Sequence, residues 1–166
     1  MTAVMFPCAA EGRNWLIALR RYLALAAAAH LFWEFAHLPL YTIWLTGTAG
    51  ELVFAAVHCT GGDILITRSA LVLALLLFAA SGWPQARAGR VLAAAILFGV
   101  GYTIFSEWLN IDVRGAWAYR EMMPVIPLID AGLSPIMQWV VVPLAAYAYA
   151  IGWQPWRRAA GEAAHG

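Results

Sequence analysis

Ionisable side chains lie inside the most apolar segments of this sequence, where each costs several kcal/mol unless it meets a partner or faces a bundle interior. In the first segment, four polar residues follow one another at i, i+4, i+7 and i+11, which predicts a single helical stripe. A carboxyl group and imidazoles on such a stripe can donate and accept protons. The stripe consists of His30, Glu34, His37 and Tyr41.

Three further apolar segments contribute polar residues of their own. His58 and Asp63 flank Gly61-Gly62, a pair that can loosen a helix and release its carbonyl groups. Whether that helix is continuous or broken is left open by the sequence. We predict that the catalytic groups are His30, Glu34, His58, Asp63 and Glu107, and that the substrate contacts His37, Tyr41, Tyr102, Thr103, Gln138 and Trp139.

The elements that position these residues are membrane-spanning helices. Of 166 residues, 63% are hydrophobic and 11% charged, which excludes an ordinary soluble domain. The net charge of +1 argues against nucleic acid as a partner. We predict an all-α, polytopic bundle forming one integral membrane domain over residues 1–166. Its four helices are expected at about 22–46, 51–80, 91–109 and 133–153, with an interfacial loop at 110–132.

Arginine positions predict the orientation, since cytoplasmic flanks carry the excess of basic residues. Seven arginines precede the first helix, join the second to the third, or follow the fourth, and two lie in the loop 110–132. We therefore expect both termini in the cytoplasm, the loop on the outer side, and a location in the bacterial inner membrane. The seven are Arg13, Arg20, Arg21, Arg87, Arg90, Arg157 and Arg158.

Helix rise predicts that the carboxyl and imidazole groups meet. At about 1.5 Å per residue, Glu34, Asp63 and Glu107 all fall between the middle of the bilayer and its outer third. One shared polar pocket is the economical arrangement. The alternative is a structural network in which these groups only join helices, at about 0.6 kcal/mol per hydrogen bond.

The segment Ala29-His30-Leu31-Phe32-Trp33-Glu34-Phe35 resembles the opening of the four-helix membrane domain in the emopamil-binding sterol isomerases and their EXPERA-domain relatives. Gly99 to Glu107 and Trp139 to Pro143 resemble that family's third and last helices. The resemblance implies that His30 and Glu34 form an acid/base pair acting on a sterol double bond, and that Trp139 faces the cationic intermediate. The chain departs from the family near Val53, where the glutamate of the second helix is missing.

The residues therefore predict an enzyme that moves a double bond in an isoprenoid- or sterol-type lipid without a cofactor. Such a reaction needs a proton donor, a proton acceptor and an aromatic face for the carbocation. The expected partner is a membrane lipid or another apolar small molecule, and an oligomer of identical subunits is compatible with so small a bundle.

Two alternatives stay open. Glu34-x-x-His37 has the spacing of a carboxylate-bridged metal site, which His58, Asp63 and Glu107 would complete around iron or another divalent metal in an oxidase or hydroxylase. The same groups could also relay protons or ions.

Overall fold

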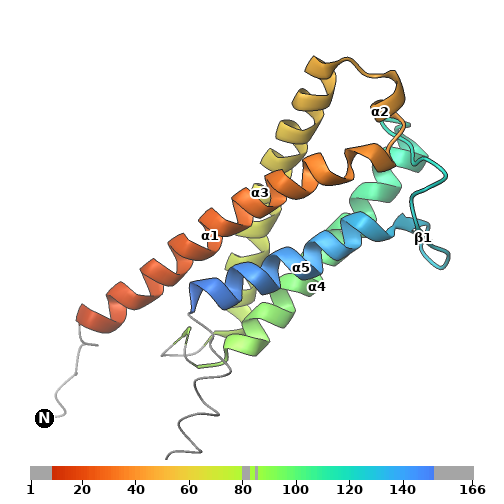
Figure 1. Ribbon diagram of the computed structural model, residues 1–166. Helices are drawn as coiled ribbons and strands as arrows, with labels where there is room; N and C mark the ends of the chain where they lie inside the picture. The colour runs from red at the N-terminus through yellow and green to blue at the C-terminus, as the bar shows by residue number, and fades with distance from the viewer. Residues whose placement is uncertain (1–8, 80–82, 85, 152–166) are drawn as a thin grey trace, which may run out of the picture.

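The computed structural model describes residues 9–79, 83–84 and 86–151, with side chains from Trp15 onward. Within these residues, four helices are long and apolar enough to cross a membrane, which indicates an integral membrane protein with an all-α fold. They run alongside one another, and α2 and β1 lie at the end where α1 stops (Figure 1). The elements are α1 (Ala9–His37), the 3-10 turn η1 (Leu38–Leu40), α2 (Ile43–Thr46), α3 (Ala49–Phe78), α4 (Ala88–Trp108), the π-helical turn η2 (Leu109–Val113), β1 (Val125–Ile126), β2 (Ala131–Gly132) and α5 (Leu133–Ala150).

The prediction of one helix over 22–46 is wrong at both ends. The helix begins at Ala9 and ends at His37, and Pro39 follows within η1. Proline has no N–H to donate and its ring crowds the preceding turn, so the α-helix does not continue through it. Tyr41 therefore lies beyond the helix, in extended backbone, and is not part of the predicted stripe.

Helix α3 answers the question that the sequence left open, because it is continuous through Gly61-Gly62. A Cβ atom added at either glycine would meet nothing within 4 Å, so neither is needed for close packing. The helix starts at a capping box. Thr48 Oγ1 accepts from the Glu51 N–H, while Glu51 Oε2 accepts from the Thr48 N–H at 2.7 Å.

The segment after α4 is more ordered than the predicted loop 110–132. The chain continues helically to Val113 through η2, and β1 pairs with β2 in a short antiparallel hairpin. Residues 118–120 pair with the segment that follows α1, through Thr42 N–H to Ala118 O at 3.0 Å and Arg120 N–H to Leu40 O at 2.9 Å. These bonds fix the segment across one end of the bundle (Figure 1).

The opposite end of the bundle is tightly packed. Its core brings α1, α3, α4 and α5 together through small and medium apolar side chains, which allow helices to approach closely in a membrane. Tyr22 packs edge-on against Tyr147, whose hydroxyl accepts from Trp83 Nε1 at 2.8 Å. We call this region the packed half; its buried residues are Tyr22, Ala26, Leu71, Ala74, Val91, Ala94, Ala95, Val142, Ala146, Tyr147 and Ala150.

Several sequence predictions fall outside the described residues. The predicted helix ends at Ala80 and Trp153 are among them, as are Arg157 and Arg158. The side chain of Arg13 is also not described, although its backbone is part of α1.

Candidate functional site

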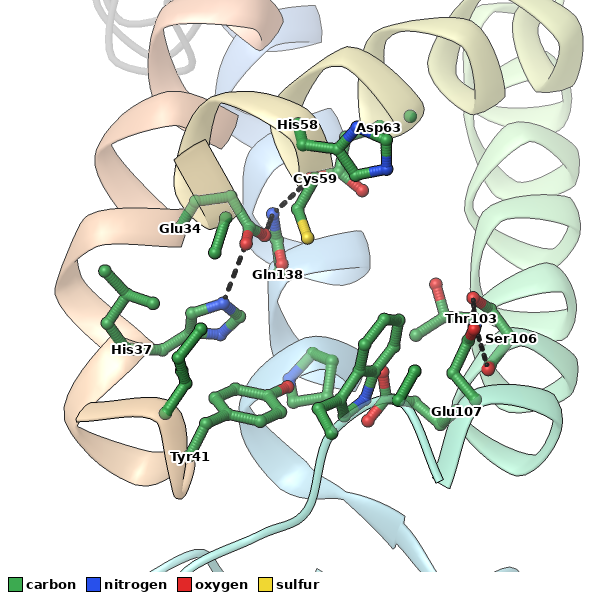
Figure 2. A pocket seen from close by; sticks show the side chains of 18 of the residues that line it. Glu34, His37, Tyr41, His58, Cys59, Asp63, Thr103, Ser106, Glu107 and Gln138 are labelled. Carbon is green, nitrogen blue, oxygen red and sulfur yellow. Dashed lines mark hydrogen bonds and ion pairs between the residues drawn. The ribbon is translucent and has the colours of Figure 1, made fainter. Parts of the chain in front are cut away.

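A cavity of about 720 Å³ lies in the half of the bundle nearest α2. All four long helices contribute to its walls, together with Arg114, Ala116 and Trp117. Figure 2 shows Glu34 and His37 on one side of it and Thr103, Ser106 and Glu107 on the other. The cavity brings together every predicted site residue except His30, namely Glu34, His37, Tyr41, His58, Asp63, Tyr102, Thr103, Glu107, Gln138 and Trp139.

Gln138 of α5 connects three of the predicted groups through a single nitrogen. Its Nε2 lies 3.0 Å from Glu34 Oε1, 2.9 Å from Asp63 Oδ2 and 2.9 Å from His30 Nδ1. A primary amide has two hydrogens, so it can donate to only two of these acceptors at once. The two carboxyl groups thus lie within two hydrogen-bond lengths of each other, on helices α1 and α3.

The second carboxylate oxygen of Glu34 also has a hydrogen-bond partner. Oε2 lies 3.1 Å from His37 Nε2, and the other ring nitrogen of His37 lies 3.2 Å from Ser134 Oγ. Trp33 Nε1 donates to that same hydroxyl at 3.2 Å. Since Ser134 Oγ already accepts from Trp33, its own proton is free for His37 Nδ1, and the proton on Nε2 then points to Glu34.

His30 lies behind the cavity wall and is fully buried. Its Nε2 is 3.1 Å from Thr67 Oγ1, and its ring packs against Trp139 with centroids 5.0 Å apart. Trp139 in turn lies flush against α4, because a Cβ atom added at Gly99 would overlap the indole. His30 therefore contacts the cavity only through Gln138, Asp63 and Trp139.

Glu107 forms a separate group on α4. Tyr119 donates its hydroxyl hydrogen to Glu107 Oε2, and the Tyr119 oxygen accepts from the Gly132 N–H at 2.8 Å. Burial, followed by the hydrogen bond to Glu107, raises the pKa of Tyr119. Burial also raises the pKa of Tyr41, and the charge of Glu107 adds to that effect. Both phenols are therefore neutral hydrogen-bond donors at physiological pH.

The rim of the cavity between α3 and α4 is exposed. His58 stacks on Phe54 with centroids 5.4 Å apart, and neither side chain is buried. Tyr102 on α4 is half exposed. Because this face of the bundle is surrounded by apolar helix surface, an opening here faces lipid. His58 thus lies at the rim, apart from the hydrogen bonds of Gln138.

The predicted metal ligands line the same cavity, but they do not form a cluster within the described residues. Among residues 9–79, 83–84 and 86–151, no three His, Cys, Asp or Glu side chains are arranged as a metal site. The Glu34-x-x-His37 spacing instead forms a hydrogen bond, and both nitrogens of His37 have protein partners. A metal at this position would have to displace those partners.

Sequence reasoning missed several residues of the site. Ser134 and Thr67 lie one helical turn from Gln138 and Asp63, so the i, i+4 rule that selected the His30 stripe would also have found them. Trp117 and Tyr119 carry no such signal, because they lie in irregular backbone.

Comparison with known proteins adds no relative: no protein-family model, curated protein or solved structure matches this chain.

Proposed function

We propose that this protein is a membrane-embedded enzyme that shifts a double bond in an apolar lipid by adding one proton and removing another. The observation that carries the proposal is the pair of carboxyl groups, Glu34 and Asp63, held by one amide nitrogen at the wall of a cavity in the membrane domain. Two carboxyl groups this close, in a low dielectric, are most stable when one is ionised and the other carries a proton. One residue pair then supplies both the acid and the base.

The hydrogen bonds assign the two roles. Glu34 accepts from Gln138 and from His37 at 3.0 and 3.1 Å, whereas Asp63 accepts from Gln138 and has only the longer contact of 3.5 Å to His30 Nδ1 among the described residues, so the negative charge is better stabilised on Glu34. Asp63 is then the proton donor and Glu34 the acceptor. His30 acts as a positioning residue through Gln138 and Asp63, since it does not line the cavity.

The reaction balances without an oxidant or a cofactor. The Asp63 proton forms a new C–H bond with one alkene carbon, using the π electrons and leaving a positive charge on the other carbon. Trp139 lines the cavity, and its aromatic ring can stabilise this cation. A neighbouring C–H bond then breaks, its electrons form the new double bond, and its proton passes to Glu34.

The membrane setting supports a lipid substrate. The rim between α3 and α4 opens through exposed aromatic residues, Phe54 and Tyr102, which allows an apolar molecule to arrive from the bilayer. The arginine distribution supports a bacterial inner-membrane location with both termini in the cytoplasm. In that orientation the cavity lies toward the outer leaflet.

Deuterium incorporation tests the reaction even before the substrate is identified. The full chain is reconstituted in vesicles of total bacterial lipid made in D₂O, and the extracted lipids are analysed by mass spectrometry. Because the proton on Asp63 exchanges with solvent, one unsaturated lipid class should gain a deuterium on carbon. Glu34→Gln and Asp63→Asn should each lower the incorporation by about 100-fold or more, the range of one acid/base group.

Glu121→Gln is the matched control, because Glu121 is exposed and does not line the cavity. It should retain the incorporation rate of the parent protein. Full incorporation in Glu34→Gln, with normal folding, would refute the proposal and leave Glu34 as a residue that joins helices.

A further inference from the structure

Arg68 is a charged residue on the outward face of a membrane-spanning helix. It lies in the interior of α3, and its side chain is exposed. Exposed apolar side chains flank it on both sides along the helix, so it falls within the surface that contacts lipid. Charged residues inside such segments almost always face a bundle interior or a partner. The flanking side chains are Val53, Phe54, Val57 and Leu65 before Arg68, and Val72, Leu73, Leu76 and Leu77 after it.

The described part of the chain provides no salt-bridge partner for Arg68. The ion pairs among the described residues join His30 to Asp63 and His37 to Glu34. Asp63, the acidic residue nearest to Arg68 in α3, lines the cavity, whereas Arg68 does not. Since an arginine keeps its charge in proteins, an acceptor for Arg68 must come from outside the described residues.

The direction of the side chain argues against a phospholipid head group as this acceptor. Ten residues follow Arg68 in α3, which is about 15 Å of helix. Side chains on a helix lean toward its N-terminus, so Arg68 leans away from the nearer end of α3 and toward the middle of the membrane. Arginines that reach the head groups do so from positions near a helix end. The acceptor therefore lies within the bilayer.

The surface around Arg68 has the pattern of a helix-packing face. Gly61, Leu65, Arg68 and Val72 recur at i, i+4, i+7 and i+11, and all four are exposed. Helices contact one another at this spacing. Nothing lies within 4 Å of a Cβ atom added at Gly61, so the bundle itself does not use this small residue. In a membrane, a small residue on such a face lets a neighbouring helix approach closely.

A second copy of the chain does not supply the acceptor. Two copies related by a two-fold axis along the membrane normal place identical residues at the same depth. Across this face, the two Arg68 side chains would meet, and like charges repel. The acidic side chains that are exposed within the described residues lie near the end of the bundle that holds α2, away from Arg68: Glu51, Asp112, Glu121 and Asp130.

We propose that the face formed by Gly61, Leu65, Arg68 and Val72 docks a transmembrane helix of another protein, which carries an aspartate or glutamate at the depth of Arg68. The carboxylate accepts from the guanidinium group, whose planar N–H groups bind a carboxylate through two parallel hydrogen bonds. Gly61 admits the backbone of the partner helix. This inference does not depend on the proposed reaction, because Arg68 lies outside the cavity.

A designed helix tests this face without knowledge of the natural partner. The full chain with Cys59→Ala carries a fluorescent donor on Cys8 and is reconstituted in phosphatidylcholine vesicles. The probes are two transmembrane peptides of leucine and alanine with an acceptor dye, one with a central glutamate and one with glutamine at that position. Energy transfer measures their binding. The glutamate peptide should bind about tenfold more tightly, the ratio expected of one hydrogen bond between charged groups.

Variants of the face separate charge from packing. Arg68→Leu removes the charge and should bind the two peptides equally, whereas Arg68→Lys should keep part of the preference. Gly61→Leu should weaken the binding of both peptides. Arg90→Leu is the control, because Arg90 is exposed at the start of α4, and it should keep the full preference. Circular dichroism during denaturation by sodium dodecyl sulfate checks that each variant is folded.

Equal binding of the two peptides by the parent protein, or an unchanged preference in Arg68→Leu, would overturn the proposal. So would each result that assigns the face to another occupant. Loss of the preference in vesicles that contain phosphatidylglycerol would assign Arg68 to a lipid phosphate. Energy transfer between differently labelled copies of the parent protein, undiminished by the glutamate peptide, would assign the face to a second copy. A preference that appears only in Glu162→Gln would assign it to the end of this chain.

Discussion

The two halves of the bundle are held together by different forces. The packed half is built from alanines and a few larger apolar residues, with Ala26, Ala74 and Ala146 almost completely buried. The other half, which we call the polar half, surrounds the cavity and is joined by hydrogen bonds of Gln138, Tyr119 and Ser134. In lipid, helices associate through close packing and hydrogen bonds, because the hydrophobic effect does not drive them together.

This difference explains how a small bundle can keep a cavity. Small residues bring the four helices into contact at one end, which fixes their relative positions without help from the other end. The polar half is then free to separate α3 from α4 around Glu34, Asp63 and Glu107. Stability is expected to depend mainly on the packed half and chemistry on the polar half.

The largest expected effect concerns the side of the membrane that each half of the bundle faces, because a cysteine on one side is either labelled or not labelled by an impermeant reagent. The seven-to-two arginine asymmetry predicts that the packed half faces the cytoplasm and the polar half the outside. In a chain with Cys8→Ser and Cys59→Ala, a cysteine at Ala118 should react with a membrane-impermeant maleimide added to intact cells. A cysteine at Ala160 should react only after lysis.

Ala118 is chosen for this experiment because it is exposed, whereas Gly115 nearby has φ +59°, where a side chain would be strained. Equal labelling of both positions in intact cells would refute the predicted orientation. The expected position of the cavity toward the outer leaflet would then lose its support.

The sequence predicted the four-helix bundle and most of the residues that line the cavity. Apolar length and the i, i+4 spacing identified four helices and placed Glu34, Asp63, Glu107 and Gln138 on the same cavity. These patterns are local, so they can be read directly from the chain. The expected roles of these residues stay predictions.

The parts that failed depend on contacts between distant segments or on one backbone choice. Pro39 ended α1 before Tyr41, although the spacing alone favoured a continuous helix. His30 has the expected position on its helix, yet Thr67, Gln138 and Trp139 cover its ring. Trp117 and Tyr119 reach the cavity only because residues 118–120 pair with the end of α1, a pairing between segments far apart in sequence.

Leu71→Ala tests whether the packed half sets stability. Leu71 is 1% exposed, so the change removes contacts from all around the side chain. We expect a loss of about 2 kcal/mol in the free energy of unfolding, the lower end of the range for buried leucines, because the lipid-embedded unfolded state offers the same apolar solvent. Denaturation by sodium dodecyl sulfate in mixed micelles, followed by circular dichroism, measures this loss.

Leu76→Ala is the control for Leu71→Ala, since Leu76 lies on the same helix and is 79% exposed. Its effect should be close to zero. The rate of deuterium incorporation per folded molecule should be unchanged in both variants. A rate that falls in Leu71→Ala, with the folded fraction accounted for, would mean that the two halves are coupled.

Gly99→Ala probes the boundary between the halves, and its expected effect on stability is the smallest. A methyl group there would overlap Trp139 Cε3, so the indole must move by enough to clear it. Overpacking of this kind costs about 1–3 kcal/mol, and better helix propensity of alanine returns up to about 1 kcal/mol. The net loss should therefore be about 1 kcal/mol. Gly101→Ala is the matched control, because nothing lies within 4 Å of the added methyl group, and it should stabilise α4 slightly.

The rate of deuterium incorporation per folded molecule should also fall in Gly99→Ala, beyond any loss of folded protein. The reason is that Trp139 packs against His30 and lines the cavity at the same time. In the proposed reaction, a displaced indole would stabilise the developing cation less, and the cation–π stabilisation it loses is worth about 1–2 kcal/mol, or roughly 5- to 30-fold in rate. Deuterium incorporation per folded molecule in Gly99→Ala and Gly101→Ala measures this difference directly. Equal rates in the two variants would show that Trp139 only fills space between α4 and α5. Trp139 would then contribute to packing, as the residues of the packed half do, and not to the reaction.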